Sequence, residues 1–367
     1  MIINDTVLKY DEKVIFALRE LYSRYGYSQY KMSKFEEYDL YVENKDFLVS
    51  DRVITFNDTD GRLLALKPDV TLSIIKNTTD EPGVKQKVYY NENVYRVSGV
   101  TGQFKEIMQM GLESIGDIDV TDIYEVVSLA LKSLAAISSD FVLDLSHMGI
   151  LSAFLSEASS SDLFKKEVIS LISNKNAHEI PKVAEKYGVD EEACKKLVLL
   201  AGMYGEPASV IKKLEPLCNS VSSAKALSEL KVLSYLLSSG EYYDKVRFDF
   251  SVVHNISYYD GIVFSGFLSG IFEAALSGGE YGKLLSGLGR KSRAIGFALY
   301  LDLLEAFYSS DRGTDVDVLL IYDDTVPAAE VISRRNALIA EGKSVSAQRV
   351  IPAKLRYASL VDLRKTK

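Results

Sequence analysis

The sequence predicts an α+β protein whose main sheet is mostly antiparallel and is flanked by helices. Three patterns lead to this fold class. Strand–turn–strand hairpins, rather than strand–helix–strand units, dominate residues 1–148 and 236–310, which we expect to form one core domain. Helical periodicity runs through residues 149–235, which predicts an all-α insertion. A short β–α–β pattern over residues 311–367 predicts a small C-terminal α/β unit.

The first half of the core is expected to begin with a helix over residues 10–25, where apolar side chains recur at helical spacing. Residues 52–67 are typical of two strands joined by a turn at DTDG. Pro68 is expected to open a helix, because proline fits the first helical turn. Two longer strands are predicted over residues 88–97 and 104–115.

The second half of the core returns to strand patterns in VRFDFSVV, YYDGIVFSGF and GIFEAAL, over residues 246–276. The glycine-rich stretch SGGEYGKLLSGLG predicts a turn. The apolar run RAIGFALYLDLLEAFY, residues 293–308, predicts a helix. In the C-terminal unit, the strand patterns VDVLLIY and SVSAQRV flank one helical segment.

Composition limits the possible classes of function. The chain is 47% hydrophobic and 26% charged, as soluble globular proteins are, and it has no run of about 18 apolar residues. The first residues lack the apolar core of a signal peptide, so we expect a cytoplasmic protein. Two cysteines and three isolated histidines give no metal-ligand spacing, so neither a metal nor a cofactor is expected. A net charge of −8 argues against nucleic acid as a partner.

One predicted strand carries an unusual polar face. In FKEIMQMGLESIG, alternate residues share a face, so Gln109, Gly111 and Glu113 lie opposite Met110 and Leu112. Glycine leaves a gap between the two polar side chains, and this gap predicts a pocket for a small molecule. The alternative is a half-exposed sheet on which Gln109 and Glu113 face solvent.

Further polar side chains occur where burial is expected. They are Asp69, Thr71, Arg96, Tyr258, Tyr259 and Tyr281. Pattern alone leaves alternatives open, because Asp69 and Thr71 also favour a helix start and a Tyr-Tyr pair is often part of a core. The phrase SGGEYG lacks the Lys-Ser/Thr of a phosphate-binding loop.

The order of these pieces resembles the histidyl-tRNA synthetase family, which has the class II aminoacyl-tRNA synthetase fold. The similarity covers most of residues 8–305. GYSQYKMSKFEEYDLY is similar to the family's first motif, which forms a dimer interface, and LKPDVT to its arginine-proline-glutamate-x-threonine element. VYRVSGVTGQFKEIMQMGLESIG resembles the second motif, SYYDGIVF a histidine-recognition element, SGGEYGKLL the glycine-rich element and GFALYLDLL the third motif.

The resemblance implies that the gap at Gly111 is a histidine pocket. A neutral imidazole needs one hydrogen-bond acceptor and one donor, which Glu113 and the Tyr259 hydroxyl would supply. The ligand's ammonium group would meet the side chains around Asp69, and tyrosines would wall the ring. The implied histidine-binding residues are Asp69, Thr71, Arg96, Gln109, Glu113, His254, Tyr258, Tyr259 and Tyr281.

The synthetase family's phosphate-handling residues are mostly replaced. Arg96 matches the arginine of the second motif, but Ser98 stands where an acid helps to seat adenine. The family's arginines become Leu303 in the third motif, His254 in the histidine-recognition element and Glu280 in the glycine-rich element. Arginine grips phosphate through its planar fork, so these changes predict that adenylate formation is lost and that the chain has no catalytic residues.

This profile resembles the regulatory-subunit family of ATP phosphoribosyltransferase, which keeps the synthetase fold without aminoacylation. The resemblance implies a non-catalytic subunit that activates a short-form catalytic subunit and mediates histidine feedback at the first step of histidine biosynthesis, in a hetero-octamer. It also implies a homodimer built through residues 8–40, with the aromatic run at Phe35, Tyr38 and Tyr41 in the interface. Too few residues follow Ser310 for a complete tRNA-reading domain. The alternatives are a divergent histidyl-tRNA synthetase-like enzyme and a synthetase-like sensor or binding module.

Overall fold

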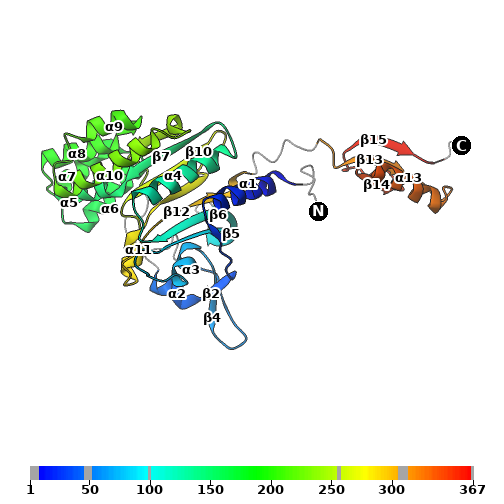
Figure 1. Ribbon diagram of the computed structural model, residues 1–367, viewed down its shortest axis with the longest axis horizontal. Helices are drawn as coiled ribbons and strands as arrows, with labels where there is room; N and C mark the ends of the chain where they lie inside the picture. The colour runs from blue at the N-terminus through cyan, green and yellow to red at the C-terminus, as the bar shows by residue number, and fades with distance from the viewer. Residues whose placement is uncertain (1–7, 45–51, 98–100, 254–257, 305–312, 365–367) are drawn as a thin grey trace. The chain divides into compact units, whose positions relative to one another are not determined.

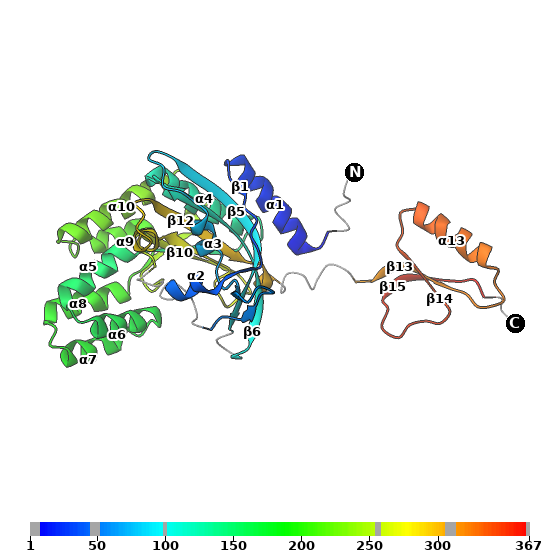
Figure 2. The same cartoon turned by 90° about the horizontal axis from the view of Figure 1, so that it is seen from below.

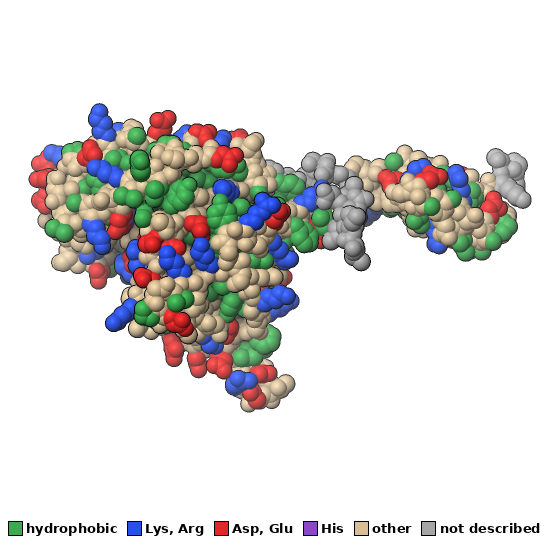
Figure 3. Space-filling model, viewed as in Figure 1, with side chains coloured by type: hydrophobic (Ala, Val, Ile, Leu, Met, Phe, Trp, Pro, Cys, Tyr) green, Lys and Arg blue, Asp and Glu red, His purple; other side chains and the backbone are tan. Residues whose placement is uncertain are grey.

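The computed structural model describes residues 8–44, 52–97, 101–253, 258–304 and 313–364 (Figure 1). Two compact units divide the chain, Met1–Ala306 and Phe307–Lys367. No helix in these ranges is long and apolar enough to cross a membrane. On the face of the larger unit drawn in Figure 3, basic and acidic side chains are interspersed, so this face offers a nucleic-acid backbone no continuous basic surface.

A nine-stranded sheet organises the larger unit, in the order β1-β5-β6-β12-β11-β10-β7-β9-β8. Neighbouring strands are antiparallel except for β1 with β5 and β7 with β9, so the predicted α+β class with a mostly antiparallel sheet is confirmed. The strands are β1 (Ser28–Gln29), β5 (Lys85–Val97), β6 (Phe104–Gly116), β7 (Phe141–His147), β8 (Tyr204–Gly205), β9 (Val246–Asp249), β10 (Ile262–Leu268), β11 (Leu276–Glu280) and β12 (Arg293–Tyr300).

Helices α1 (Tyr10–Arg24) and α4 (Val120–Ala135) lie side by side on one face of this sheet (Figure 2). α1 contacts β5, and α4 contacts β7, β10, β11 and β12. The Tyr22 hydroxyl of α1 is 2.9 Å from the Ser133 hydroxyl of α4, and both side chains are buried. The helix predicted over residues 10–25 is confirmed, and its apolar stripe is the face that packs on the sheet.

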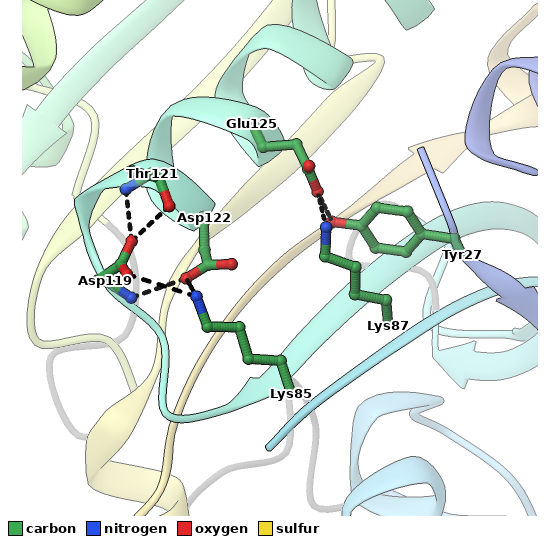
Figure 4. Close-up of polar contacts among 7 residues, drawn as sticks. All are labelled: Tyr27, Lys85, Lys87, Asp119, Thr121, Asp122 and Glu125. Carbon is green, nitrogen blue, oxygen red and sulfur yellow. Dashed lines mark hydrogen bonds and ion pairs between the residues drawn. The ribbon is translucent and has the colours of Figure 1, made fainter. Parts of the chain in front are cut away.

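Ion pairs fasten α4 to β5 (Figure 4). Lys85 Nζ lies 2.6 Å from an Asp122 carboxylate oxygen, and Lys87 Nζ lies 2.7 Å from Glu125 Oε1. The hydroxyl of Tyr27 donates a hydrogen bond of 3.0 Å to the same Glu125 oxygen. These groups are mostly half-buried and satisfy one another, so this cluster is a structural contact between sheet and helix.

The cavity described below lies on the opposite face of the sheet, where a small second sheet, β2-β4-β3, and short helices pack. The hairpin predicted over residues 52–67 is confirmed. The helix predicted from Pro68 begins later, at Thr71, and the Asp69 carboxylate accepts a hydrogen bond of 2.9 Å from the Leu72 N–H in its first turn. Tyr41 is buried within the chain, so it is unavailable for the predicted dimer interface. The small sheet and the short helices on this face are β2 (Phe35–Glu37), α2 (Tyr38–Glu43), β3 (Thr55–Asn57), β4 (Leu63–Leu66), α3 (Thr71–Lys76) and α11 (Gly282–Gly287).

Six helices, α5 to α10, gather at the end of the sheet formed by β7, β9 and β8 (Figure 1). The predicted run of helices is interrupted by β8, a two-residue strand antiparallel to β9, which is too short to give a periodic pattern. The boundaries of an insertion at residues 149 and 235 stay a prediction. The helices are α5 (Met148–Ala158), α6 (Asp162–Ser173), α7 (Ile180–Lys186), α8 (Glu191–Ala201), α9 (Pro207–Leu214) and α10 (Val221–Leu237).

Three predicted elements between residues 270 and 304 were wrong. GIFEAAL is mostly turn, and the strand is β11, Leu276–Glu280, inside the expected glycine-rich turn. The expected helix from Arg293 is the strand β12, followed by the short 3-10 helix η4 (Leu301–Leu304). β12 pairs with β6 and β11 in the middle of the sheet, and an apolar run of this length does not reveal by itself whether it is helix or strand.

The C-terminal unit is a three-stranded parallel sheet, β14-β13-β15, with one helix. The predicted β–α–β unit is confirmed as β13 (Val316–Ile321), α13 (Ala328–Ala340) and β14 (Val345–Gln348), and the sequence missed β15 (Tyr357–Asp362). Its small core forms around Leu320, Val326 and Val331.

Candidate ligand-binding site

A cavity of about 460 Å³ opens on the sheet between β5, β6, β11, β12 and the start of α3. The structure brings eight of the nine predicted site residues together in its lining, although they come from four separate parts of the sequence. His254 lies outside the described residues, while its neighbour Val253 lines the cavity. The eight are Asp69, Thr71, Arg96, Gln109, Glu113, Tyr258, Tyr259 and Tyr281.

Glu113 is a buried acid of the cavity with a raised pKa. Its side chain is 3% exposed, and it accepts hydrogen bonds from the Thr71 hydroxyl at 2.8 Å and from the Tyr281 hydroxyl. Burial raises the pKa of Glu113 to about 8, although both hydroxyl donors lower it. Asp69 raises this pKa further. Glu113 is therefore a buried carboxyl group whose ionisation a cationic or hydrogen-bond-donating ligand would favour.

A glycine on the neighbouring strand makes room for this carboxyl group. Gly296 on β12 pairs directly with Glu113 on β6. A Cβ atom at Gly296 would lie 1.8 Å from Glu113 Oε2, closer than any real contact. The sheet therefore holds the Glu113 side chain flat across the backbone of β12, and only glycine is compatible with that position.

The gap predicted at Gly111 is not open to a ligand. Gly111 pairs with Tyr90 on β5, and a Cβ atom at Gly111 would lie 2.5 Å from the Tyr90 hydroxyl oxygen. The Tyr90 side chain therefore fills the space beside Gly111. The cavity lies instead where β12 presents Gly296 and Ala298, so the predicted pocket exists but the residue that makes room for it was wrong.

Asp69 and Arg96 form an ion pair at the edge of the cavity. Arg96 Nη2 lies 3.6 Å from Asp69 Oδ2, and Arg96 Nε donates a hydrogen bond of 2.7 Å to the carbonyl oxygen of Pro68. Burial raises the pKa of Asp69, and the Arg96 charge opposes this rise. The Asp69 carboxylate also accepts a hydrogen bond from the Leu72 N–H in the first turn of α3, so this residue both stabilises the helix start and lines the cavity.

Gln109 is 2% exposed, so the alternative in which Gln109 and Glu113 face solvent is wrong. Its Nε2 atom is buried without a hydrogen-bond partner among the described residues. A buried donor without a partner is costly, and a ligand oxygen in the cavity would satisfy it.

Tyrosine rings wall the cavity. The ring centroid of Tyr258 lies 4.6 Å from that of Tyr259 and 5.3 Å from that of Tyr281. The Tyr281 hydroxyl is bonded to Glu113, so this residue orients the carboxyl group as well as walling the site. Sequence reasoning missed the cavity residues Tyr90, Ser277, Gly296, Ala298 and Tyr300. Three of these lie on β12, whose strand alternation would have revealed them had the segment been recognised as a strand.

At the two replaced phosphate-handling positions that the structure describes, 280 and 303, no cationic side chain is present. Leu303 lies in η4 and is half-buried, so it offers no charge. Glu280 is buried and ion-paired with Arg293, which neutralises the acid that replaces an arginine of the family pattern. Ser98 lies outside the described residues. The mostly antiparallel sheet, the amino-acid-sized cavity and these replacements define a class II synthetase-like protein with a cavity on its sheet.

Comparisons with known proteins agree with this class. A family model for histidyl-tRNA synthetase matches residues 6–304. An ATP phosphoribosyltransferase regulatory subunit of Oceanobacillus iheyensis is 26% identical over 354 residues, covering 95% of this chain and 87% of that protein. Another, from Alkaliphilus metalliredigens, is 28% identical over 78% of this chain and 73% of its own length. The chain therefore belongs to the histidyl-tRNA synthetase family, in its branch of ATP phosphoribosyltransferase regulatory subunits.

Solved structures share the fold. An ATP phosphoribosyltransferase regulatory subunit/histidyl-tRNA synthetase from Bacillus halodurans C superposes with a TM-score of 0.77 at 23% identity, covering 100% of this chain and 97% of that one. A histidyl-tRNA synthetase from Nostoc sp. PCC 7120 gives a TM-score of 0.72 at 17% identity, covering 96% and 87%. The predictions of a synthetase-like fold and of a regulatory subunit of ATP phosphoribosyltransferase in histidine biosynthesis are confirmed.

Proposed function

We propose that the chain activates the short-form catalytic subunit of ATP phosphoribosyltransferase and that its cavity binds histidine as a feedback effector. The proposal that histidine is the ligand is supported by the buried Glu113 carboxyl group, which two hydroxyl donors orient inside a cavity of amino-acid size. A solved structure shows an ATP phosphoribosyl transferase (HisG:HisZ) complex from Thermotoga maritima. A chain of that structure has a TM-score of 0.62 to this chain at 19% identity, covering 80% of this chain and 97% of that one.

The cavity supplies complementary groups for histidine. Glu113 accepts a hydrogen bond from a ring N–H, and the Tyr259 hydroxyl serves the second ring nitrogen. The ammonium group lies toward Asp69, whose charge it would share with Arg96. Tyr258 contributes an aromatic wall for the ring. In the bound state, the N–H of the histidine ring thus donates to Glu113, which is a buried acid in the free protein.

The positions at which the synthetase family handles phosphate support a non-catalytic role. Adenylate formation needs cations that stabilise charge on the transferring phosphate, and Leu303 and the Glu280–Arg293 pair supply none that is uncommitted. The competing candidate is a divergent synthetase-like enzyme. Histidine-dependent pyrophosphate exchange by the purified chain decides between them: we expect none above background, and clear exchange would refute the non-catalytic role.

Regulation is tested with the cognate catalytic subunit. Adding the chain should raise the turnover of that subunit, and histidine should then lower it, because feedback requires different affinities for two states of the complex. The variant Glu113→Gln should still activate but should respond only to higher histidine concentrations. A complex whose rate ignores millimolar histidine would remove the sensor role and leave activation.

We also propose that the chain forms a two-fold dimer through residues 8–40 and the adjoining strands, within a hetero-octamer. The side chain of Phe35 is 45% exposed, and its ring centroid lies 5.5 Å from that of the partly exposed Phe56. This aromatic pair is therefore available on the surface. Light scattering at micromolar concentration should give a dimer, and Phe35→Asp should weaken it. A monomeric wild-type chain would contradict this assignment.

A further inference from the structure

A second cavity, of about 540 Å³, lies between the helical region and the core sheet. Most of its lining comes from α5 and from the first half of α10. Among the described residues, Tyr259 is the one that lines both this cavity and the ligand cavity. The Tyr259 side chain is therefore a direct link between the two helices and the proposed histidine site.

The backbone that follows Tyr259 is tied to the start of α5. The N–H of Met148, the first residue of α5, donates a hydrogen bond of 2.8 Å to the carbonyl oxygen of Gly261. Between these positions, the Asp260 N–H donates a hydrogen bond of 3.1 Å to the carbonyl oxygen of Glu280. A side chain that lines two cavities has open space beside it, so its position depends strongly on such backbone bonds. The start of α5 therefore helps to set where the Tyr259 hydroxyl lies.

His147 and Glu229 hold the start of α5 in place. His147 is the N-cap residue of α5 and is 2% exposed, and its Nδ1 atom accepts a hydrogen bond of 3.0 Å from the Gly149 N–H. Because Nδ1 is an acceptor, Nε2 carries the ring proton and donates it to a Glu229 carboxylate oxygen on α10, 3.0 Å away. This hydrogen bond lowers the pKa of Glu229, so the acceptor is an ionised carboxylate and the bond is charge-assisted.

Close packing around Gly149 makes the position of α5 sensitive to this pair. A Cβ atom at Gly149 would lie 2.9 Å from His147 Cε1 and 3.2 Å from the Ala226 Cβ atom on α10. The backbone of α5 thus lies directly against the His147 ring and against α10. A shift of the His147 ring must therefore move the start of α5, because densely packed groups transmit displacement.

We propose that His147 and Glu229 are positioning residues for Tyr259: they fix the start of α5 and, through it, the backbone that carries the tyrosine. This inference rests on the proposed function, since it takes the Tyr259 hydroxyl to bond the imidazole ring of histidine. It links α5 and α10 to the ligand cavity, so histidine binding and the arrangement of these two helices influence each other.

Isothermal titration of the full chain with L-histidine tests this role. Glu229→Ala removes the acceptor and keeps a good helix former, and we expect histidine to bind about 10-fold more weakly, the effect of one displaced hydrogen bond. His147→Asn keeps an oxygen that can cap α5 but loses the bond to α10, so it should behave alike. Glu229→Gln retains an acceptor oxygen and should bind histidine within about 3-fold of the wild type. Glu157→Ala, in the wall of the same cavity near the other end of α5, is the matched control and should change affinity by less than about 2-fold.

Tyr259→Phe separates positioning from a general loss of structure. If the pair acts through the Tyr259 hydroxyl, Glu229→Ala should change histidine affinity by less than about 2-fold in the Tyr259→Phe background, because the group that it displaces is absent. An equal loss in both backgrounds, or no loss in the otherwise wild-type chain, would overturn this inference alone. A wild-type chain that does not bind histidine would overturn the proposed histidine pocket as well.

Discussion

Glu113 on β6 and Glu280 on β11 are two equally buried glutamates of one sheet, yet their surroundings differ. Glu113 is 3% exposed, lines the cavity and receives hydrogen bonds from the Thr71 and Tyr281 hydroxyls. Glu280 is 2% exposed, is paired with Arg293 and is not among the residues that line the cavity. Among the described residues, no lysine or arginine pairs with Glu113. One carboxyl group is therefore available to a ligand, and the other is neutralised by its own chain.

This difference teaches why binding and catalysis can be separated in this fold. In the proposed site, recognition of the ligand depends on close packing, because Gly296 leaves room for Glu113 and the Tyr281 hydroxyl donates a hydrogen bond to it. Phosphate handling depends on cations, and this chain has Leu303 and Glu280 at two positions where the family pattern has arginine. The residues that hold Glu113 and the phosphate-handling positions can thus change independently.

The largest expected effect comes from Gly296→Ala. The added methyl group would lie 1.8 Å from Glu113 Oε2 and 2.5 Å from the Leu112 carbonyl oxygen, so the strand or the carboxyl group must move. Overpacking of this kind costs about 1–3 kcal/mol of stability. We expect histidine affinity to fall by more than about 100-fold, measured by titration, because Glu113 loses its position.

Gly202→Ala is the control for that substitution, because a Cβ atom there would meet its nearest neighbours at an ordinary 3.8 Å. It should change neither denaturant unfolding nor histidine affinity measurably. Retained affinity in Gly296→Ala would mean that Glu113 is not a binding group.

The next effect is that of Glu113→Gln. The loss of a charge-assisted hydrogen bond should weaken histidine binding by about 10- to 100-fold. The substitution also tests the raised pKa of about 8. Between the unfolded value of 4.5 and about 8 the folded state holds a proton that the unfolded state releases, so wild-type stability falls as pH rises through this window.

The Gln variant lacks this titration. Its stability relative to the wild type should therefore rise between about pH 5 and pH 8 and level off above, by on the order of 3–5 kcal/mol. Denaturant unfolding of both proteins at several pH values measures this difference. A difference that does not change with pH would show that Glu113 ionises normally.

Much of this site was predictable, and the failures have physical causes. Gln109 and Glu113 were identified because strand alternation puts them on one face, and ordered family motifs supplied their partners. Tyr90 was missed because its contact with Gly111 depends on the register of β5 against β6, which single-strand patterns do not contain. Gly296 was missed because β12 has an apolar run compatible with a helix, and only its place in the middle of the sheet decides otherwise.

A smaller effect is expected for His254→Arg. If the ligand carboxylate lies toward residue 254, an imidazole supplies positive charge only when protonated, whereas arginine supplies it at every accessible pH. A nearby carboxylate favours the charged imidazole, so this contribution of the wild type is present at low pH and fades as pH rises. The ratio of histidine affinities, variant over wild type, should grow to about 10-fold between about pH 5.5 and 8.5.

The titration of the ligand is common to both proteins, so the ratio isolates residue 254. Histidinamide is the control ligand, since it carries no carboxylate, and its ratio should stay constant with pH. A flat ratio for histidine would place residue 254 away from the ligand carboxylate.

The smallest expected effect is that of Glu280→Gln, which is the matched counterpart of Glu113→Gln. Both substitutions replace a buried carboxyl group by an amide of the same shape. Because Glu280 lies outside the cavity lining, histidine affinity should change by less than about 2-fold. Removing its charge leaves Arg293 with a half-exposed side chain that water can solvate, so the loss of stability should be about 1 kcal/mol. Titration and denaturant unfolding of both variants, made side by side, give the comparison. Equal losses of affinity in the two variants would mean that the cavity responds to any buried charge in the sheet, and the distinction between a binding carboxyl group and a neutralised one would fail.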